Sequence, residues 1–375
     1  MINLSKQDCA AENDPEDKVQ DDGHPEPLDL TSLIEGLPDS VALQCLARVP
    51  LHYHPALRRV SRAWRSALRS PEFFRTRKLA GVEEEWLYAS AYEPDKVWQA
   101  YDPVVDCWST LPVLPSCIKH LANFGTASVD GKLYVVGGGS DEVDPQTGDR
   151  NETTATNEVW RFDPVTGKWE QRAPMITSRS QFACCVLDDQ IVAAGGFTNT
   201  RKALALAEMY NPVLDKWESL PELSQVHNAA CSGIVFEEKV HVVHKGTSQA
   251  QVYDAKENRW VLADSGWAGG EMAVVNSELY VVRHGLASRE QKQPPFWKLL
   301  SSWPECMRRI SFGVVGLGND LYVIGGVIPR PNISDILQLS DVDICNVGSE
   351  NPNWRKGASM TLCKGTVLGC ATVKL

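Results

Sequence analysis

A basic side chain recurs at the same position in successive copies of a repeat, directly before the opening strand of each copy. These positions are Lys119 or His120, Arg179, His227, Arg308 with Arg309, and Lys364. Ammonium and guanidinium groups bind carboxylates and phosphates through charge-assisted hydrogen bonds, so a ring of them could hold an acidic or phosphorylated peptide. Taken one at a time, each could instead be a solvated loop charge or a cap on a neighbouring carbonyl group.

The remaining polar residues do not indicate catalysis. The eight histidines include no H-x-x-x-H or H-E-x-x-H spacing for a metal, and neither a P-loop nor a nucleophile elbow occurs. The triple Gly137-Gly138-Gly139 follows a strand but precedes a loop, whereas a phosphate cradle needs a helix after it. The sequence therefore predicts no catalytic residue, no metal site and no cofactor.

Cysteine content and charge narrow the class of protein. Eleven cysteines without C-x-x-C spacing predict reduced thiols, and Cys184-Cys185 is expected to lie in an ordinary strand. The net charge of −11 divides into −8 over residues 1–35, +7 over residues 36–80 and −10 over the rest, which does not favour nucleic-acid binding. With neither a long apolar stretch nor a secretory signal, we expect a protein of the cytoplasm and/or nucleus that makes no membrane contact.

The elements that would position these residues change character along the chain. Residues 1–30 are rich in Asp, Glu and Pro, which predicts a disordered acidic tail. Residues 31–80 have helical periodicity, with one helix from Pro38 to Pro50, a second from near Pro55, and a third that Ser70 and Pro71 open. Three short helices form a marginal core, so this domain is expected to need a partner.

Residues 85–375 lose the helical period and form an internal repeat. A strand ends in Gly-Gly, a variable loop follows, and an aromatic residue with Asp or Asn then precedes a Trp by seven residues. The clearest copy reads DGKLYVVGGG and then NEVWRFDPVTGKWEQRAP, in which Phe162 and Trp169 are the aromatic pair. We count six copies, of which the first lacks its opening strand.

The repeat has a physical logic. Gly-Gly allows a close backbone approach that a side chain would block, and Trp provides a large apolar plate between sheets. Four short strands cannot bury both faces of one sheet, but a ring of such sheets can. Residues 365–375, GTVLGCATVKL, form a leftover strand, so we predict that they pair inside the first sheet and close the ring.

The repeat resembles the kelch motif, and its copies cover residues 86–375. The resemblance implies an all-β, six-bladed β-propeller in which the loops after Gly-Gly and the links between blades emerge on one face. Long loops on a rigid scaffold commonly carry recognition. The longest span residues 138–157, the stretch from Arg283 and the stretch around Arg330. Arg283 and Arg330 therefore join the basic residues above in the predicted target-binding face.

The helical stretch resembles an F-box. Its Leu-Pro start, spaced aliphatic residues and late Trp-Arg are matched by Leu37, Pro38, Leu46, Val49, Leu57, Val60, Trp64 and Arg65. By resemblance, this domain docks on a Skp-type adaptor, which ties it to a cullin-RING ubiquitin ligase. The predicted adaptor contacts are Leu37, Pro38, Leu46 and Val49. Trp64 is expected to hold the helices together rather than to touch the adaptor.

Together these patterns predict a multi-domain chain: a tail (1–30), an all-α F-box domain of three helices (31–80) and a kelch β-propeller (85–375) closed by its C-terminal strand. The predicted function is that of a non-catalytic receptor that brings an unidentified target protein to a ubiquitin ligase. Two alternatives are a kelch scaffold that binds the cytoskeleton, which needs no F-box, and a propeller enzyme, which needs a metal or carboxylate cluster.

Overall fold

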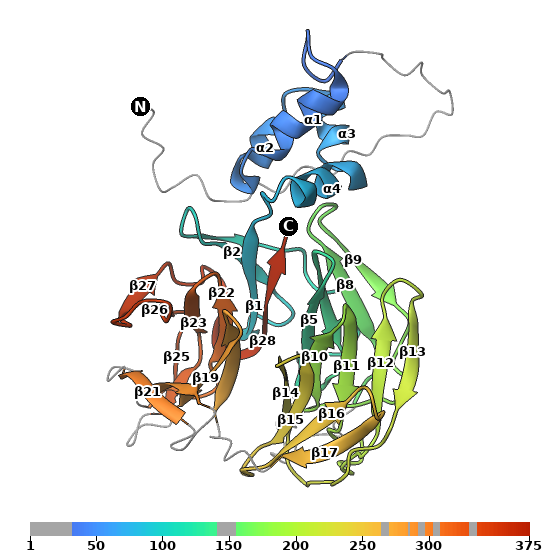
Figure 1. The fold of residues 1–375 in the computed structure, drawn as a ribbon, viewed down its shortest axis with the longest axis vertical. Helices are drawn as coiled ribbons and strands as arrows, with labels where there is room; N and C mark the ends of the chain where they lie inside the picture. Colours follow the sequence, from blue (N-terminus) through green and yellow to red (C-terminus); the bar gives the residue numbers. More distant parts are fainter. Residues whose placement is uncertain are drawn as a thin grey trace. The chain divides into compact units, whose positions relative to one another are not determined.

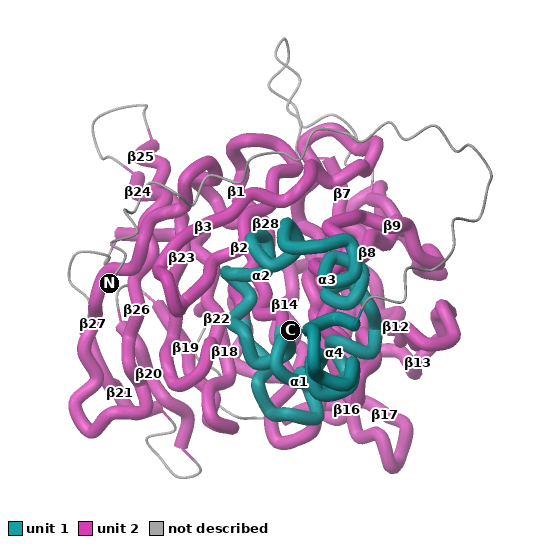
Figure 2. The backbone as a smooth tube through the Cα atoms, turned by 90° about the horizontal axis from the view of Figure 1, so that it is seen from above, with its two compact units in different colours: residues 1–85, 374–375 teal, residues 86–373 magenta. Residues whose placement is uncertain are grey.

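The described part of the chain forms two compact units. In the computed structural model, the described residues are 32–140, 155–263, 270–283, 286–291, 297–302, 308–329 and 336–375. Figure 2 colours the first unit, residues 1–85 with 374–375, and the second, residues 86–373. The acidic tail predicted for residues 1–30 lies outside the described residues.

The first unit is helical. It contains α1 (Asp39–Ala47), the 3-10 turn η1 (Leu51–Tyr53), α2 (His54–Leu57), α3 (Arg62–Ala67) and α4 (Pro71–Leu79) (Figure 1). Pro38 stands directly before α1, and Ser70 caps α4 because its Oγ accepts a hydrogen bond from the amide of Phe73 at 3.2 Å. The first and third predicted helices are therefore found where the sequence indicates them.

The second predicted helix is divided into α2 and α3. Ser61 is extended (φ −156°, ψ 164°), and its Oγ accepts a hydrogen bond from the amide of Trp64 at 3.0 Å. A residue that caps a helix in this way has left helical geometry itself, so it starts a new helix rather than continuing the previous one. Within residues 32–80, which the structure describes, the three predicted helices are corrected to four short α-helices and the 3-10 turn η1.

A small apolar core and one buried arginine hold these helices together. The buried core residues are Leu43, Leu46, Ala47, Leu68 and Phe73. Arg77 of α4 is 1% exposed and donates hydrogen bonds to the carbonyl oxygens of Ala47 (2.8 Å) and Val49 (3.0 Å). These hydrogen bonds join α4 to the carbonyl end of α1, where the helix dipole favours a cation.

The second unit consists of six four-stranded antiparallel sheets, which are the blades of a β-propeller (Figure 1). Blade 1 has β28 (Lys364–Lys374), β1 (Glu85–Glu93), β2 (Gln99–Asp102) and β3 (Cys107–Thr110). Blade 2 has β5 (Gly125–Val129), β6 (Lys132–Val136), β8 (Val159–Asp163) and β9 (Lys168–Arg172). Blade 3 has β10 (Ala183–Leu187), β11 (Gln190–Ala194), β12 (Ala207–Asn211) and β13 (Lys216–Leu220).

The other three blades follow in chain order. Blade 4 has β14 (Cys231–Phe236), β15 (Lys239–His244), β16 (Ala250–Asp254) and β17 (Arg259–Ala263). Blade 5 has β18 (Glu271–Val275), β19 (Glu278–Arg283), β20 (Leu286–Glu290) and β21 (Trp297–Ser302). Blade 6 has β22 (Gly313–Leu317), β23 (Asp320–Ile324), β26 (Val342–Asn346) and β27 (Trp354–Gly357). Two small hairpin-like pairs are β4 (Leu121–Ala122) with β7 (Gly139–Ser140), and β24 (Val327–Pro329) with β25 (Ile336–Gln338).

The C-terminal strand completes blade 1. The strand order of this sheet is β28-β1-β2-β3, so the last strand of the chain pairs beside the first strand of the propeller. The prediction that residues 365–375 close the ring is confirmed. Closure in this way removes the free strand edges that an open row of blades would leave at β1 and β28.

The repeated aromatic pair forms as the spacing predicts. Tyr210 lies directly across from Trp217 in the β12–β13 ladder, with their ring centroids 5.1 Å apart. The Trp217 indole N–H also donates to the carbonyl oxygen of Ala173, in the link from the preceding blade, at 2.9 Å. Trp108, Trp169 and Trp260 make the same kind of bond at 2.8 to 2.9 Å. Each of these Trp residues therefore joins its blade to the preceding link.

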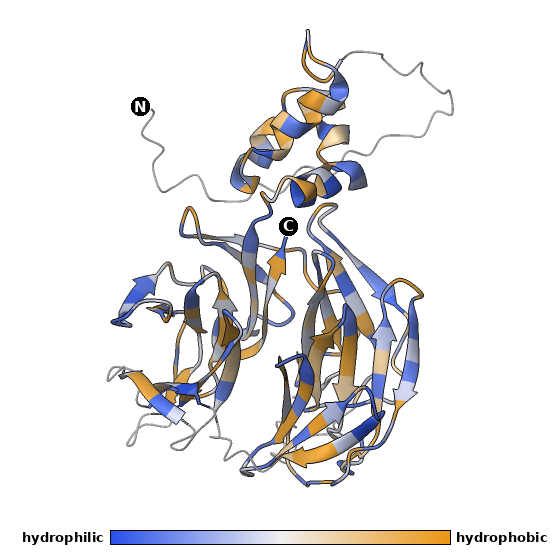
Figure 3. Cartoon of the chain, viewed as in Figure 1, coloured by the Kyte–Doolittle hydropathy of each residue, from blue (hydrophilic) through white to orange (hydrophobic). Residues whose placement is uncertain are grey.

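The Gly-Gly pairs are required where the backbones of a blade and a link meet. Gly196 has φ +85°, and a Cβ atom there would lie 2.6 Å from the carbonyl oxygen of Ser180. Hydropathy changes across a blade, since the second strand of blade 3, β11, is coloured mainly hydrophobic and its fourth strand, β13, mainly hydrophilic (Figure 3). The second strand of the blade is thus buried on both faces, while the outermost strand faces solvent on one side.

Candidate protein-binding surfaces

An exposed apolar stripe runs along α1. Leu37 and Val41 are 38% and 41% exposed, and Pro38 and Cys45 are exposed as well. Val41 and Cys45 are four residues apart and share one face of α1, and Leu37 and Pro38 directly precede this helix. We call these four residues the α1 stripe. The opposite face of α1 enters the core, which leaves the stripe available to an external partner.

Only part of the predicted adaptor contact set lies on this stripe. Leu37 and Pro38 are exposed, but Leu46 is 2% exposed and packs in the core of the helical unit. The prediction that Leu46 contacts an adaptor is therefore corrected, because the folded core already buries its side chain. Val49 is half-buried, and its carbonyl oxygen takes a hydrogen bond from Arg77 at 3.0 Å.

The sequence prediction missed Val41 and Cys45. Both follow Leu37 at a spacing of four, while the small residue Ala42 lies on the buried face. That pattern was available in the sequence and would have placed the stripe correctly. Trp64 behaves as expected, since it packs against the helical core and its indole N–H donates to the Leu33 carbonyl oxygen at 2.5 Å.

The propeller brings its links and its Gly-Gly loops together. In blade 2, β4 of the link pairs with β7 directly after the glycines. In blades 3 and 6, isolated bridges join Ser180 to Phe197 and Ile310 to Val327 in the same way. Links and loops therefore emerge side by side, as the resemblance to the kelch motif implied. We call the exposed part of these segments the loop face.

Several predicted target-binding residues are exposed. Lys119, Arg283, Arg308 and Lys364 all present their side chains to solvent, and Lys364 Nζ lies 3.5 Å from a carboxylate oxygen of Glu93. His120, the alternative to Lys119, is also exposed. His227 is half-buried and lies against His244, with ring centroids 4.5 Å apart. Arg330 and the acidic stretch 141–154 lie outside the described residues.

The predicted loop that starts at Arg283 is partly a strand. Residues Leu286–Glu290 form β20, which pairs with β19 and β21 as the third strand of blade 5. No aromatic-Asp pair marks the third strand of this copy in the sequence, so the strand after the opening SELYVV was placed too late and residues 286–290 were assigned to a loop. Arg283 itself ends β19 and is exposed.

Arg179 and Arg309 do not contribute to the loop face. Arg179 is fully buried, with its guanidinium 2.7 Å from a Glu208 carboxylate oxygen and 2.9 and 2.7 Å from the carbonyl oxygens of Gly195 and Leu206. Burial lowers the pKa of Arg179 and the Glu208 charge opposes that shift. The prediction that this residue contacts a target is corrected, because its donors bind the protein itself.

Arg309 has the same internal role in blade 6. It is 1% exposed, and its guanidinium donates to the Asp343 carboxylate at 2.8 Å and to the carbonyl oxygen of Asp341 at 2.9 Å. It also donates to the carbonyl oxygen of Gly325. Arg309 is therefore a structural residue, and the alternative of a cap on neighbouring carbonyl groups describes both buried arginines.

The carboxylate partners of these arginines occupy a position that is polar and buried in four of the blades. This position lies on the third strand, two residues before the residue that pairs with the Trp of the fourth strand. Its occupants are Gln99, Glu208, Gln251 and Asp343. Gln99 Oε1 accepts hydrogen bonds from the amides of Leu362 and Cys363, both at 3.0 Å. Buried backbone amides of a link need such partners, so these residues fix the link between blades.

Metal-ligating side chains are not grouped in the described ranges. Among the described residues, no three His, Cys, Asp or Glu side chains come close enough together to hold a metal ion. Cys184 and Cys185 lie in β10 as expected, and burial raises the pKa of Cys184 to about 12. In the described parts of the chain, no helix is both long enough and apolar enough to span a bilayer.

Comparison with known proteins agrees with both units. Residues 34–76 match the family model of the F-box domain, and residues 120–176 and 178–224 match that of the Kelch motif. The F-box/kelch-repeat protein SKIP30 of Arabidopsis thaliana is 48% identical over 347 residues, which are 92% of this chain and 98% of SKIP30. The F-box/kelch-repeat protein At1g16250 of the same plant is 28% identical over 374 residues, 92% of this chain and 97% of its own.

A solved structure agrees with the propeller fold. The structure of YjhT superimposes with a TM-score of 0.58 over 72% of this chain and 95% of YjhT, at 15% sequence identity. At this identity the likeness shows the fold alone.

Proposed function

Because this chain belongs to the F-box/kelch-repeat family, we propose that it is the substrate-recognition subunit of an SCF-type cullin-RING ubiquitin ligase. The helical unit would bind a Skp-type adaptor, and the loop face of the propeller would bind the target protein. The observation that carries the proposal is the α1 stripe, an apolar surface in the segment that matches the F-box domain. An exposed apolar stripe on a domain with a thin core is typical of a surface that a partner covers.

In this proposal the chain performs no bond chemistry. Its two surfaces hold the target near the transfer module of the ligase, which raises the effective concentration of target lysines. Ubiquitin transfer belongs to the other subunits, and the proteasome degrades the modified target. The place of action would be the cytoplasm, the nucleus or both, where such ligases and their targets meet.

The first test measures adaptor binding by the purified full-length chain. We expect Val41→Asp to weaken binding of a Skp-type adaptor about thirtyfold, because a desolvated carboxylate at the centre of an apolar contact costs roughly 2 kcal/mol. Val41 is exposed, so the helical unit should keep its stability. Val213→Asp is the matched control, since Val213 is 92% exposed in the β12–β13 turn of the propeller.

Isothermal titration calorimetry measures the adaptor affinity of both variants. Equal adaptor affinity of the two variants would remove the α1 stripe from the proposal. In cells treated with a proteasome inhibitor, the Val41→Asp chain should still capture a target through the propeller, while ubiquitin on that target is lost. A target that stays modified would show that the ligase reaches it by another route.

A further inference from the structure

A small antiparallel sheet on the loop face of blade 6 has an apolar side. The link residue Ile310 exchanges two backbone hydrogen bonds of 2.9 Å with Val327 of β24, and Val327 lies directly across from Gln338 of β25. The link, β24 and β25 therefore lie side by side, and Figure 2 shows the two strands next to each other. Since side chains alternate along a strand, Ile310, Val327, Pro329 and Ile336 share one side of this sheet.

The apolar residues of this side are exposed at its edges. Ile310 is 44% exposed and Ile336 is 59% exposed, and Pro329, which lies directly across from Ile336, is exposed as well. Val327, between the link and β25, is buried and forms the floor. We call these four residues the hairpin patch. A contiguous apolar surface of this kind, unlike single exposed residues, marks a site that another chain covers.

Blade 3 shows that the propeller does not require an apolar residue in this part of the link. Its link residue Ser180 makes the same backbone bridge, to Phe197, with hydrogen bonds of 3.0 and 2.9 Å. Ser180 is 9% exposed, whereas Ile310 at the equivalent place presents its larger apolar side chain to solvent. Packing inside blade 6 does not account for that side chain, while a partner that buries it does.

Arg308 borders the hairpin patch on the side of the link. It is exposed and stands two residues before Ile310, while Arg309 between them is buried. This alternation places Arg308 and Ile310 on the same side of the link, about 6 to 7 Å apart along the chain. A guanidinium beside an apolar surface suits a ligand that combines a carboxylate with an apolar side chain.

The border on the side of β25 carries a carboxylate of its own. Gln338 Nε2 donates to Glu93 Oε1 at 3.3 Å, and Lys364 Nζ lies 3.5 Å from Glu93 Oε2. An acidic residue of a ligand at this end would be repelled by Glu93, whose charge Lys364 already faces. The hairpin patch is therefore polarised, and a ligand carboxylate is favoured at the end of Arg308.

We infer that the hairpin patch binds an extended segment of the target protein in which an aliphatic or aromatic residue lies two positions from Asp or Glu. The apolar side chain packs on Ile310, Pro329 and Ile336, and the carboxylate accepts hydrogen bonds from the Arg308 guanidinium. An extended segment repeats its side chains on one face every two residues, about 6 to 7 Å, which matches the spacing of Arg308 and Ile310. The inference rests on the proposed function, because it names the class of target segment that the loop face takes.

Selection from a phage-displayed library of random peptides on the immobilised full-length chain tests the class of ligand. We expect the selected peptides to carry Asp or Glu two positions from Leu, Ile, Phe or Met about fivefold more often than the starting library. The most enriched peptide is then synthesised with a fluorescein label, and fluorescence anisotropy measures its dissociation constant. Selected peptides without this spacing would overturn the inference.

The affinity of this peptide distinguishes the two sides of the hairpin. Ile336→Ser should weaken binding about tenfold, because the apolar side chain of the ligand loses a main contact. Leu337→Ser is the matched control, since Leu337 is also exposed but lies on the opposite side of β25, and it should change the affinity by less than about twofold. Circular dichroism checks that both variants fold, and equal affinities of the two variants would contradict the hairpin patch.

An exchange of charges tests the contact with Arg308. Arg308→Glu should weaken binding of the same peptide about tenfold, because the carboxylate then meets a like charge. A second peptide, with Lys in place of the acidic residue, should bind the Arg308→Glu chain more tightly than it binds the unaltered chain. Misfolding cannot produce such a reversal, and a Lys peptide that binds both chains equally would remove Arg308 from the site.

These results separate the inference from the proposed function. Peptide binding needs no adaptor, so Val41→Asp should leave the peptide affinity unchanged while it weakens adaptor binding. Equal binding by the Ile336→Ser and Leu337→Ser chains would overturn the inference and leave the receptor proposal in place. Failure of the receptor proposal would instead appear as an unaltered chain that binds the peptide but no Skp-type adaptor.

Discussion

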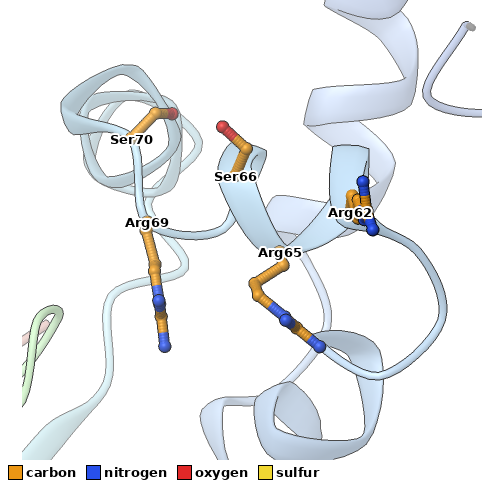
Figure 4. Close-up of a pocket in the computed structure, with 5 residues that line it drawn as sticks. All are labelled: Arg62, Arg65, Ser66, Arg69 and Ser70. Atoms are coloured by element: carbon orange, nitrogen blue, oxygen red, sulfur yellow. The ribbon is translucent and has the colours of Figure 1, made fainter. Parts of the chain in front are cut away.

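The arginines of two inter-blade links in the propeller and the arginines of α3 in the helical unit (Figure 4) have opposite uses. In the propeller, Arg179 and Arg309 are buried, and each meets a carboxylate within 2.8 Å. In the helical unit, Arg62 and Arg65 are exposed, and no carboxylate of the described residues lies within 4 Å of them. A buried guanidinium with a carboxylate fixes structure, while an exposed one without a partner is available for binding.

The difference arises from a distant strand rather than from the residues beside each arginine. Glu208 lies 29 residues after Arg179, and Asp343 lies 34 residues after Arg309. Each carboxylate comes from the third strand of the blade that the arginine's link enters. Among the described residues no carboxylate reaches the arginines of α3, which remain at the surface of the helical unit, whereas Arg77 of α4 is buried against the carbonyl oxygens of Ala47 and Val49.

The largest expected effect is the loss of stability when a buried arginine of the propeller is replaced. Arg179→Ala should lower the free energy of unfolding by about 3–5 kcal/mol, because it leaves the buried Glu208 charge without its cation. Arg309→Ala should fall near the lower end of that range, since Lys356 Nζ lies 2.7 Å from the other oxygen of Asp343. Urea denaturation measures both values.

The control for this prediction is the neighbouring residue. Arg308 is exposed, so Arg308→Ala should change stability by less than about 0.5 kcal/mol. Equal losses for Arg308→Ala and Arg309→Ala would mean that the buried ion pair does not stabilise blade 6.

A second expected effect is a dependence of the stability of the helical unit on pH. Burial lowers the pKa of His54, in the helical unit, to about 4, and the ring also faces the charges of Arg77, Arg58 and Glu84. Between pH 6.5 and about 4 the unfolded chain therefore takes up a proton that the folded chain does not. Stability of the helical unit should fall by about 3 kcal/mol as pH decreases through this window, and should be constant above it.

Hydrogen exchange resolved along the chain measures this effect in each unit. His54→Gln should remove the pH dependence from residues 39–79 only. The propeller should keep its own dependence, because burial also lowers the pKa of His244 to about 4. A pH slope that persists in the helical unit of the variant would assign the acid sensitivity to another group.

The smallest expected effect concerns the break between α2 and α3. Ser61→Ala should destabilise the helical unit by about 1 kcal/mol, because the amide of Trp64 loses its cap. The same substitution inside α3, Ser66→Ala, should be neutral or slightly stabilising, since Ala favours the helix interior. Thermal unfolding of the two variants tests the pair, and identical midpoints would show that Ser61 does not set the start of α3.

The sequence predicted those features that depend on residues close in the chain or on an exact repeat. The Tyr210–Trp217 pair follows from a fixed spacing of seven residues across a tight turn, and the leftover strand at 365–375 follows from the missing strand of the first copy. Pro38, Ser70 and Pro71 likewise act within one turn of a helix. Such local signals need no knowledge of what lies elsewhere in the fold.

The site was less predictable because exposure depends on packing. Leu46 and Val41 are both aliphatic residues of α1, and only the position of α4 decides that Leu46 is buried and Val41 is exposed. In the same way, nothing beside Arg179 reveals that Glu208 will cover it. A basic residue before a strand is consistent with both a target contact and an internal pair, and the tertiary structure selects between them.

The position of β28 also has a consequence for biosynthesis. The strand that pairs with β1 leaves the ribosome roughly 270 residues after β1 itself. At about 10 residues per second, the edge of β1 waits roughly half a minute for its partner. Blades 2 to 6 can form during that time, but blade 1 stays unfinished until β28 has emerged. A chain truncated before β28 would leave this edge open, which would expose an unpaired strand to chaperones and proteases.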